Sequence, residues 1–287
     1  MSLVDAVARS LLEGLTTVLP LSDSGHRLAA RIWLGETRGL AELARLAEIG
    51  CLVGLLLAVR GRLAEALSEG IRGIAKPTVL TTTSGGRDAT ALVVAAVVAG
   101  GVEVPVRFVV APFDDVPLVV GAGLLFTAAG LLSTLFAPSP KRSAPSPLGA
   151  MLVGLAHGLA VVPGASRIGS AFVVMRWMGM AGVNAAEMAM MITLPVLGFR
   201  AAMAFFRGQP FAPFELGEVV LVVVVSFLAA TLAAGWWRHL AARSRTAWLS
   251  LWLVTLSLAI LAYGRALPRP TDYLPLGSGR GSDPSAR

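Results

Sequence analysis

Long apolar stretches dominate the chain and set the first expectation about its fold. An α-helix needs about 20 residues to cross roughly 30 Å of hydrocarbon. Six stretches approach that length, at residues 43–59, 87–103, 116–136, 184–206, 216–235 and 247–263. The pattern therefore predicts an all-α polytopic membrane protein with six transmembrane helices.

Two further apolar stretches, residues 3–35 and 148–176, are interrupted at their centres by PLSDSGH and PGASRIGS. The arms on either side of each interruption are too short to cross a bilayer separately. Proline and polar backbone at membrane depth also need cover from protein or from a water-filled cavity. We therefore expect each stretch to form a re-entrant helical hairpin. A single kinked span is the alternative for each.

The two interrupted stretches resemble each other at a constant offset of 144 residues. EGL at 13–15 aligns with HGL at 157–159, and Asp23 aligns with Arg167. A hairpin plus three spans is an odd number of crossings, so the second half would run in the opposite orientation, as in inverted-repeat membrane proteins. We expect the two turns to meet, with Asp23 and Arg167 closer than roughly 12 Å, about a Debye length. Chance similarity of two Gly- and Ser-containing turns is the alternative.

The repeats divide one transmembrane domain, residues 1–264, into two halves. The first repeat covers about 1–136 and the second about 148–264, and the Pro- and Ser-rich segment 137–147 links them. Basic residues concentrate in 60–87, 137–147 and 236–246, so these segments are expected inside and both termini outside. The tail, residues 265–287, has the composition of a disordered segment.

Composition agrees with a membrane location and excludes several other classes. Hydrophobic residues make up 55% of the chain and charged residues only 14%, against roughly 25% charged in soluble domains. The net charge of +7 comes from basic residues beside apolar spans, so we expect no nucleic-acid partner. A single cysteine, Cys51, excludes disulfide frameworks and zinc knuckles. No signal peptide is evident, because Asp5, Arg9 and Glu13 punctuate the first apolar block.

Ionisable residues gather at the two predicted hairpins. Such groups are costly in a membrane and are therefore functional candidates. Glu13, Asp23 and His26 lie in the first hairpin, and His157 and Arg167 lie in the second. A loop that leads into a helix N-terminus presents backbone N–H groups, and Arg167 adds a fork of donors. The pattern predicts a phosphate or carboxylate site with acid and base groups nearby.

Three other charged residues in predicted spans allow simpler interpretations. Arg200 lies about two turns from Arg207, so we expect it to snorkel to the interface and not to contact a substrate. Glu48 is either an ion ligand or a hydrogen-bonded packing residue. Glu187 is either functional or a helix cap.

Two segments carry recognisable motifs, EGLTTVLPLSDSGH at 13–26 and PGASRIGSA at 163–171. They resemble the two signatures of the undecaprenyl pyrophosphate phosphatases, E-G-x-T-E-F-L-P-x-S-S-x-G-H and P-G-x-S-R-S-G-A-T. The segment 184–198, NAAEMAMMITLPVLG, is similar to the span that follows the second signature. The resemblance covers most of the chain and implies the fold of hairpins and six spans expected above.

The resemblance implies a bacterial inner-membrane enzyme that removes the terminal phosphate of a C55 isoprenyl diphosphate, which recycles a carrier lipid for cell-wall synthesis. Glu13 matches the first carboxylate of the family's Glu pair, His26 its signature histidine, and Arg167 its phosphate-binding arginine. Thr17 replaces the second carboxylate, and Asp23 replaces the serine usually assigned as nucleophile. The second signature departs at Ile168, Ser170 and Ala171, and His157 stands where a glutamine is expected.

We therefore expect Glu13, Asp23, His26 and Arg167 to be catalytic. Asp23 would either restore the missing carboxylate or attack phosphorus itself, with His26 as general acid or base. The third interpretation is that Asp23 pairs with Arg167 and blocks the site. A divalent cation, Mg²⁺ or Ca²⁺, is expected at Glu13 together with the substrate phosphates. The expected substrate-binding residues are Thr17, Ser22, Ser24, Gly25, His157, Gly164, Ser166, Gly169 and Ser170.

The expected partners are an isoprenyl diphosphate lipid and the bilayer, and the oligomeric state is open between a monomer and a homodimer. A flippase or transporter for a phosphorylated lipid is the main alternative, because paired inverted hairpins are also a transporter architecture. A non-catalytic, regulatory relative is a third interpretation.

Overall fold

The computed structural model describes residues 2–35, 39–206 and 214–264. The expected disordered tail and Arg207 lie outside these residues. Within them the chain is all-helical, with no sheet and one isolated β-bridge. The α-helices are α1 (Leu3–Val18), α2 (Asp23–Leu34), α3 (Leu40–Ala75), α4 (Val79–Thr82), α5 (Ser84–Val110), α6 (Pro117–Ser133), α7 (Pro147–Leu159), α8 (Arg167–Trp177), α9 (Gly182–Phe206), α10 (Leu216–Ala242) and α11 (Leu249–Tyr263).

Five helical segments of the described chain are long and apolar enough to cross a membrane. They are Ser84–Phe113, Pro117–Phe136, Gly182–Met203, Leu216–Ala242 and Thr246–Tyr263. Five of the six predicted spans lie within or largely within them. The sixth, 43–59, lies in the 36-residue α3, where Arg45, Glu48 and Arg60 raise the charge of the segment. The prediction of several membrane-spanning helices is confirmed, and a crossing by α3 stays a prediction.

The two interrupted stretches fold as pairs of helices that pack on each other, α1 with α2 and α7 with α8. Serine caps explain why the second helix of each pair begins where it does. The Ser22 hydroxyl accepts a hydrogen bond from the Gly25 amide at 3.2 Å, and the Ser166 hydroxyl accepts one from the Gly169 amide at 3.1 Å. These equivalent caps start α2 and α8 at positions 144 residues apart. Each stretch is therefore a helical pair and not one kinked helix.

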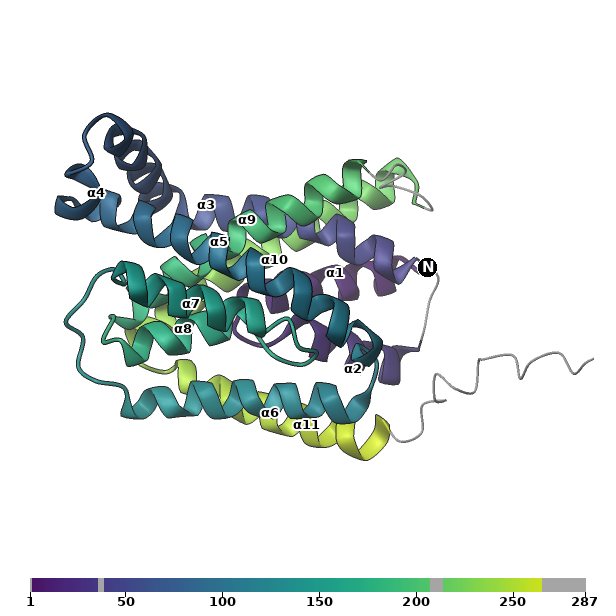
Figure 1. Ribbon diagram of the computed structural model, residues 1–287. Coiled ribbons are helices and arrows are strands. Elements are labelled where there is room, and N and C mark those ends of the chain that lie inside the picture. Colours follow the sequence, from purple (N-terminus) through teal and green to yellow (C-terminus); the bar gives the residue numbers. More distant parts are fainter. Residues whose placement is uncertain (1, 36–38, 207–213, 265–287) are drawn as a thin grey trace, which may run out of the picture.

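The first helix of each pair packs against a long helix from the other half of the chain. Helix α1 lies on α10, and α7 lies on α5 (Figure 1). Glycines at equivalent positions permit these close approaches. A Cβ atom added at Gly14 would lie 2.5 Å from the Ala229 Cβ, and one added at Gly158 would lie 2.7 Å from the Ala99 carbonyl oxygen. The two halves are thus interlocked through their hairpins.

Helices α6 and α11 pack together along one side of the molecule and support the two hairpin turns (Figure 1). Gly164 in the second turn has φ +84°, and an added Cβ would lie 1.9 Å from the Val120 carbonyl oxygen of α6. The Ser166 amide donates to the Thr127 hydroxyl of α6 at 2.9 Å. The turn between α7 and α8 is therefore held by backbone contact as well as by hydrogen bonds.

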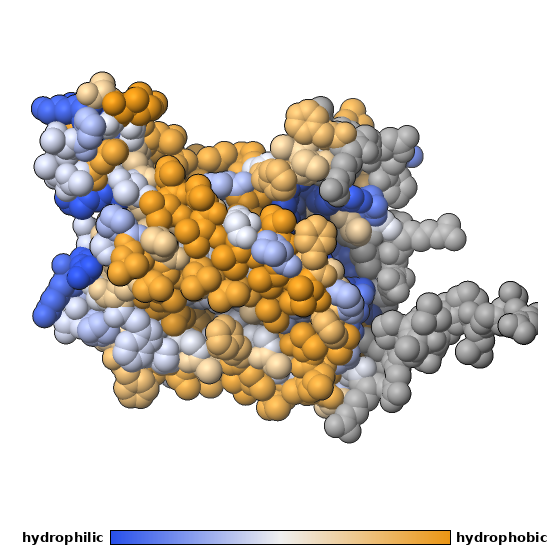
Figure 2. All heavy atoms as spheres, in the orientation of Figure 1, coloured by the Kyte–Doolittle hydropathy of each residue, from blue (hydrophilic) through white to orange (hydrophobic). Residues whose placement is uncertain are grey.

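The outer surface agrees with a lipid environment. Figure 2 shows apolar residues across the middle of the molecule, with hydrophilic residues gathered toward its two ends. Large apolar side chains on the long helices face outward, including Phe126 at 67% exposure and Leu232 at 73%. An apolar surface of this extent is unusual for a soluble monomer.

Candidate functional site

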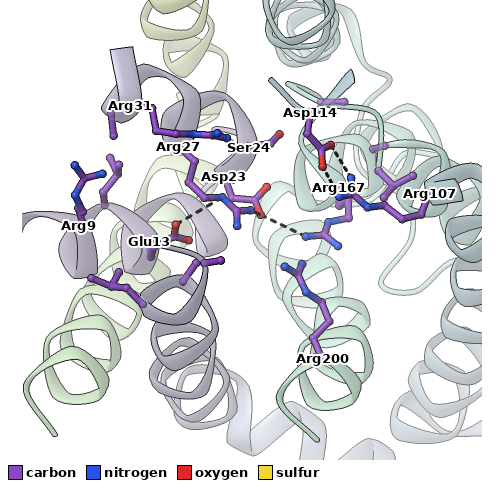
Figure 3. Close-up of a pocket in the computed structure, with 18 of the residues that line it drawn as sticks. Arg9, Glu13, Asp23, Ser24, Arg27, Arg31, Arg107, Asp114, Arg167 and Arg200 are labelled. Atoms are coloured by element: carbon purple, nitrogen blue, oxygen red, sulfur yellow. Dashed lines mark hydrogen bonds and ion pairs between the residues drawn. The ribbon is translucent and has the colours of Figure 1, made fainter. Parts of the chain in front are cut away.

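A cavity of about 550 Å³ lies beside the two hairpins. Its walls come from α1, α2, α5 and α9, from the starts of α3 and α8, and from the turn before α6 and the turn between α7 and α8. Figure 3 shows that most of its charged side chains are arginines. The ionisable lining residues are Arg9, Arg27, Arg31, Arg107, Arg167, Arg200, Glu13, Asp23, Glu103 and Asp114.

The two hairpins meet through Asp23 and Arg167. Asp23 is the first residue of α2 and Arg167 is the first residue of α8, so both side chains leave from helix N-termini. The Arg167 Nη2 atom lies 3.5 Å from the Asp23 Oδ2 atom. The predicted proximity of these two residues is confirmed.

Arg167 also contacts Glu103 of α5, with 2.9 Å between Nη1 and Oε1. Two different guanidinium nitrogens therefore bind carboxylates from two different helices. Glu103 is the last residue of the predicted span 87–103, and no role was predicted for it. Its position in an apolar segment could have identified it, because a carboxylate in such a segment is a functional candidate.

Arg27 is a second arginine between carboxylates, and it was not among the residues predicted to form the site. Its Nη2 atom lies 2.5 Å from the Asp23 Oδ2 atom, and its Nε atom lies 3.6 Å from the Glu13 Oε1 atom. Residues 23 and 27 are one helical turn apart, a spacing at which opposite charges pair on the same face. That spacing is the signal that could have identified Arg27 as part of the site.

The turn before α2 is strained and is tied to the other hairpin. Ser22 has φ +68°, a conformation that a residue with a side chain adopts at a cost of order 1–3 kcal/mol. Ser24 accepts a hydrogen bond from the Gly164 amide at 2.9 Å. A direct hydrogen bond thus links the two turns beside the Asp23–Arg167 pair.

A second, smaller cavity of about 20 Å³ adjoins the first, because Asp23, Arg167 and Arg200 line both. Its other lining residues include Thr17 and Glu48. Its volume is enough for about one water molecule. Arg200 forms an ion pair with Glu48 and lines both cavities. The expectation that Arg200 snorkels to the interface is therefore wrong, because a buried carboxylate on α3 holds its guanidinium at the site.

His26 turns away from the cavity toward α11. Its Nδ1 atom lies 2.8 Å from the Ser22 carbonyl oxygen, and its Nε2 atom lies 2.8 Å from the Trp252 Nε1 atom. An indole N–H only donates and a carbonyl only accepts, so these partners assign the neutral imidazole with its proton on Nδ1. His157 is fully buried on α7, with Nε2 3.4 Å from the Thr193 hydroxyl.

The expected site residues therefore fall into two groups. Those that line one or both cavities are Glu13, Thr17, Asp23, Ser24, Ser166 and Arg167. The others line neither cavity, and most of them build or support the turns: Ser22, Gly25, His26, His157, Gly164, Gly169 and Ser170.

The donor set at the cavity does not fit a resident metal ion. Within the described residues, no three His, Cys, Asp or Glu side chains are grouped as ligands. Glu13 and Asp23 are the carboxylates of the first hairpin that face the cavity, and Arg27 contacts both. The divalent cation expected at Glu13 stays an untested prediction.

Comparisons with known proteins give a consistent result. A family model described as bacitracin resistance protein BacA matches residues 6–259. An undecaprenyl-diphosphatase of Acaryochloris marina is 27% identical over 261 residues, which cover 88% of this chain and 96% of the relative. Undecaprenyl-diphosphatases of Cereibacter sphaeroides and Sorangium cellulosum are 29% and 30% identical and cover 80% and 79% of this chain, and 85% and 75% of their own lengths.

Proposed function

Because this multi-pass membrane protein belongs to the bacitracin resistance protein BacA family, we propose that it is an undecaprenyl-diphosphatase. The reaction is hydrolysis of a C55 isoprenyl diphosphate to the isoprenyl monophosphate and inorganic phosphate. The relatives that carry this name are similar over most of the chain. The location that follows from this function is a bacterial inner membrane, where the monophosphate would return to cell-wall synthesis.

We also propose that the two halves form an inverted repeat, that the α1–α2 and α7–α8 pairs are re-entrant, and that α3 is the sixth span. Support comes from the equivalent serine caps and from the reciprocal packing of α1 on α10 and of α7 on α5. A site at the meeting point of two re-entrant hairpins suits a lipid whose polar head must reach protein groups from within the bilayer.

One observation carries the proposed activity: Asp23 and Arg167, each the first residue of a hairpin helix, meet in a cavity lined by six arginines and four acidic residues. Arginine forks match phosphate oxygens in a bidentate way. Helix N-termini add a favourable potential for anions. The arginines of the cavity can therefore bind the diphosphate head group beside the carboxylate of Asp23.

We assign the attack to Asp23. A carboxylate oxygen of Asp23 forms a bond to the terminal phosphorus, the bond from phosphorus to the bridging oxygen breaks, and the electron pair stays on the isoprenyl monophosphate. Water then attacks the aspartyl phosphate, which releases phosphate and regenerates Asp23. Arg167 binds the transferred phosphoryl group, and Glu13 is the carboxylate assigned to accept the proton from water.

His26 contributes differently from the expectation of a general acid or base. Its two hydrogen bonds join the Ser22 turn to Trp252 of α11. We therefore assign it to positioning the turn that presents Asp23 to the cavity.

The test is phosphate release by purified protein supplied with an isoprenyl diphosphate. Asp23→Asn keeps the size but can neither attack nor carry the charge, so release should fall by at least about 100-fold, on the scale of a lost essential group. Asp23→Ser restores a hydroxyl nucleophile and should retain activity. Asp115→Asn, at a carboxylate that pairs with Arg31, is the matched control and should behave like the parent.

Trapping with hydroxylamine should detect an aspartyl phosphate in the parent and none in Asp23→Asn. Full activity of Asp23→Asn would refute the assignment of the nucleophile. A parent protein that releases no phosphate under any condition would refute the phosphatase.

Binding or movement of the lipid without hydrolysis is the second candidate, and one observation favours it. The Asp23 Oδ2 atom contacts both Arg27 and Arg167, and an oxygen held by two cations is a weaker nucleophile. Under this candidate the parent would bind an isoprenyl phosphate or diphosphate with no phosphate release.

A further inference from the structure

The first hairpin places one guanidinium between its two carboxylates. Arg27 of α2 contacts Asp23 at the start of the same helix and Glu13 of α1. Figure 3 shows the Arg27 side chain directed between these two residues at the wall of the cavity. Because Arg27 joins the two arms of the hairpin, it acts on the site as a fixed positive charge.

This position is where a divalent cation would be expected to bind. Mg²⁺ and Ca²⁺ take carboxylate oxygens and substrate phosphates as ligands. Glu13 and Asp23 are the carboxylates that the first hairpin offers, and both already have a cationic partner. A metal ion bound between them would lie within a few ångströms of the guanidinium and would be repelled by it.

Arg27 remains accessible to a ligand despite these contacts. Its side chain is 32% exposed, while the Glu13 and Asp23 side chains are 7% and 19% exposed. The guanidinium has five N–H donors and contacts two carboxylates, so it has donors left for phosphate oxygens. A guanidinium that faces a transferring phosphoryl group stabilises the charge that develops there.

The charge balance of the cavity also favours arginines as the source of positive charge. Its lining includes six arginines and four acidic residues, an excess of two positive charges. Arg200, which would add to the charge near the phosphates, is held in place by its ion pair with Glu48. Fixed arginines therefore supply the positive charge that a diphosphate needs.

We propose that the guanidinium of Arg27 takes the place of a divalent cation between Glu13 and Asp23, so that this protein turns over its lipid diphosphate without a bound metal. The inference rests on the proposed function and specifies how that site neutralises charge. Arg27 binds the phosphate oxygens as the bond from the terminal phosphorus to the bridging oxygen breaks. It receives no proton and forms no bond to phosphorus.

The first measurement uses the parent protein alone. Phosphate release from isoprenyl diphosphate should be the same in EDTA as in millimolar Mg²⁺ or Ca²⁺. Titration with Mn²⁺, followed by electron paramagnetic resonance in the absence of lipid, should detect no bound metal. Release that stops in EDTA and returns with a cation would overturn the inference and leave the phosphatase intact.

The second measurement uses Arg27→Gln, which removes the charge but keeps hydrogen-bonding groups. In EDTA its phosphate release should fall by about 100-fold, the scale of a lost charge-stabilising donor. Added Mg²⁺ or Ca²⁺ should restore much of that loss, because Glu13 and Asp23 would then be free to bind the ion. The variant should also bind Mn²⁺.

Arg31→Gln is the matched control. Arg31 lies one turn further along α2 and lines the same cavity, but it forms an ion pair with Asp115 and not with a carboxylate of the hairpin. This variant should show neither metal rescue nor Mn²⁺ binding. A lack of both in Arg27→Gln, or Mn²⁺ binding by the parent, would overturn the inference. If neither the parent nor either variant releases phosphate in any condition, the proposed function fails. The Mn²⁺ titration alone then decides whether Arg27 replaces a cation.

Discussion

Replacement of Arg167 by lysine tests whether the geometry of the arginine matters as well as its charge. The Nη1 atom of Arg167 lies 2.9 Å from Glu103, and the Nη2 atom lies 3.5 Å from Asp23. The lysine ammonium has three N–H donors on a single nitrogen, so it cannot reproduce the planar fork in which two separate nitrogens reach the two carboxylates. Arg167→Lys should therefore retain the charge of the cavity and lose the bridge between α5 and α2.

The structure gives the magnitude of the effect. A hydrogen bond to a charged group contributes about 1.5–3 kcal/mol, and the loss of one such bond corresponds to a fall of about 10- to 150-fold in kcat/KM. The assay is phosphate release from an isoprenyl diphosphate at a series of substrate concentrations, which separates kcat from KM. Arg45→Lys, at a surface arginine that pairs with Glu42, should leave both constants unchanged. If Arg167→Lys stays within about twofold of the parent in kcat/KM, the bidentate role of Arg167 is refuted.

Three further predictions concern the turns. Gly164→Ala should lower the free energy of unfolding by at least about 2 kcal/mol, because φ is +84° and the new Cβ would lie 1.9 Å from a backbone oxygen of α6. Thermal unfolding in detergent measures this loss, and Gly100→Ala, where an added Cβ meets nothing within 4 Å, is the control. Ser24→Ala should cost about 1–3 kcal/mol in the same assay, because the Gly164 amide loses its acceptor, and an unchanged unfolding temperature would contradict the link between the turns. Trp252→Phe removes the donor to His26 and should lower the unfolding temperature without moving the pH profile of kcat; a displaced profile would assign His26 to proton transfer.

Much of the fold follows from local sequence. The long apolar segments predicted the membrane helices because the thickness of a bilayer sets a length that hydropathy alone reveals. The polar interruptions predicted where α1 ends and α2 begins, because Pro20 and the Ser22 cap act on their own backbone. The 144-residue offset then predicted that Asp23 and Arg167 meet, since equivalent positions of two interlocked halves are neighbours.

The partners of the site residues depended on tertiary structure. Glu103 and Arg200 come from α5 and α9, and no local pattern indicates that these helices converge on one cavity with α1 and α2. Arg200 shows the reason. A charged side chain in a membrane span is stabilised either by reaching the interface or by pairing with a buried opposite charge. The packing of α3 beside α9 supplies Glu48 as the partner of Arg200.

The orientation of His26 depended on tertiary structure for the same reason. The motif places this histidine three residues after Asp23, but residues three apart on a helix need not point at the same ligand. Trp252, 226 positions away, donates to its Nε2 atom and holds the imidazole against α11. The sequence by itself determined which chemical groups the protein has and the helices that carry them. The folded chain decided which groups face the cavity, because hydrogen-bond and ion-pair partners come from helices that are distant in sequence.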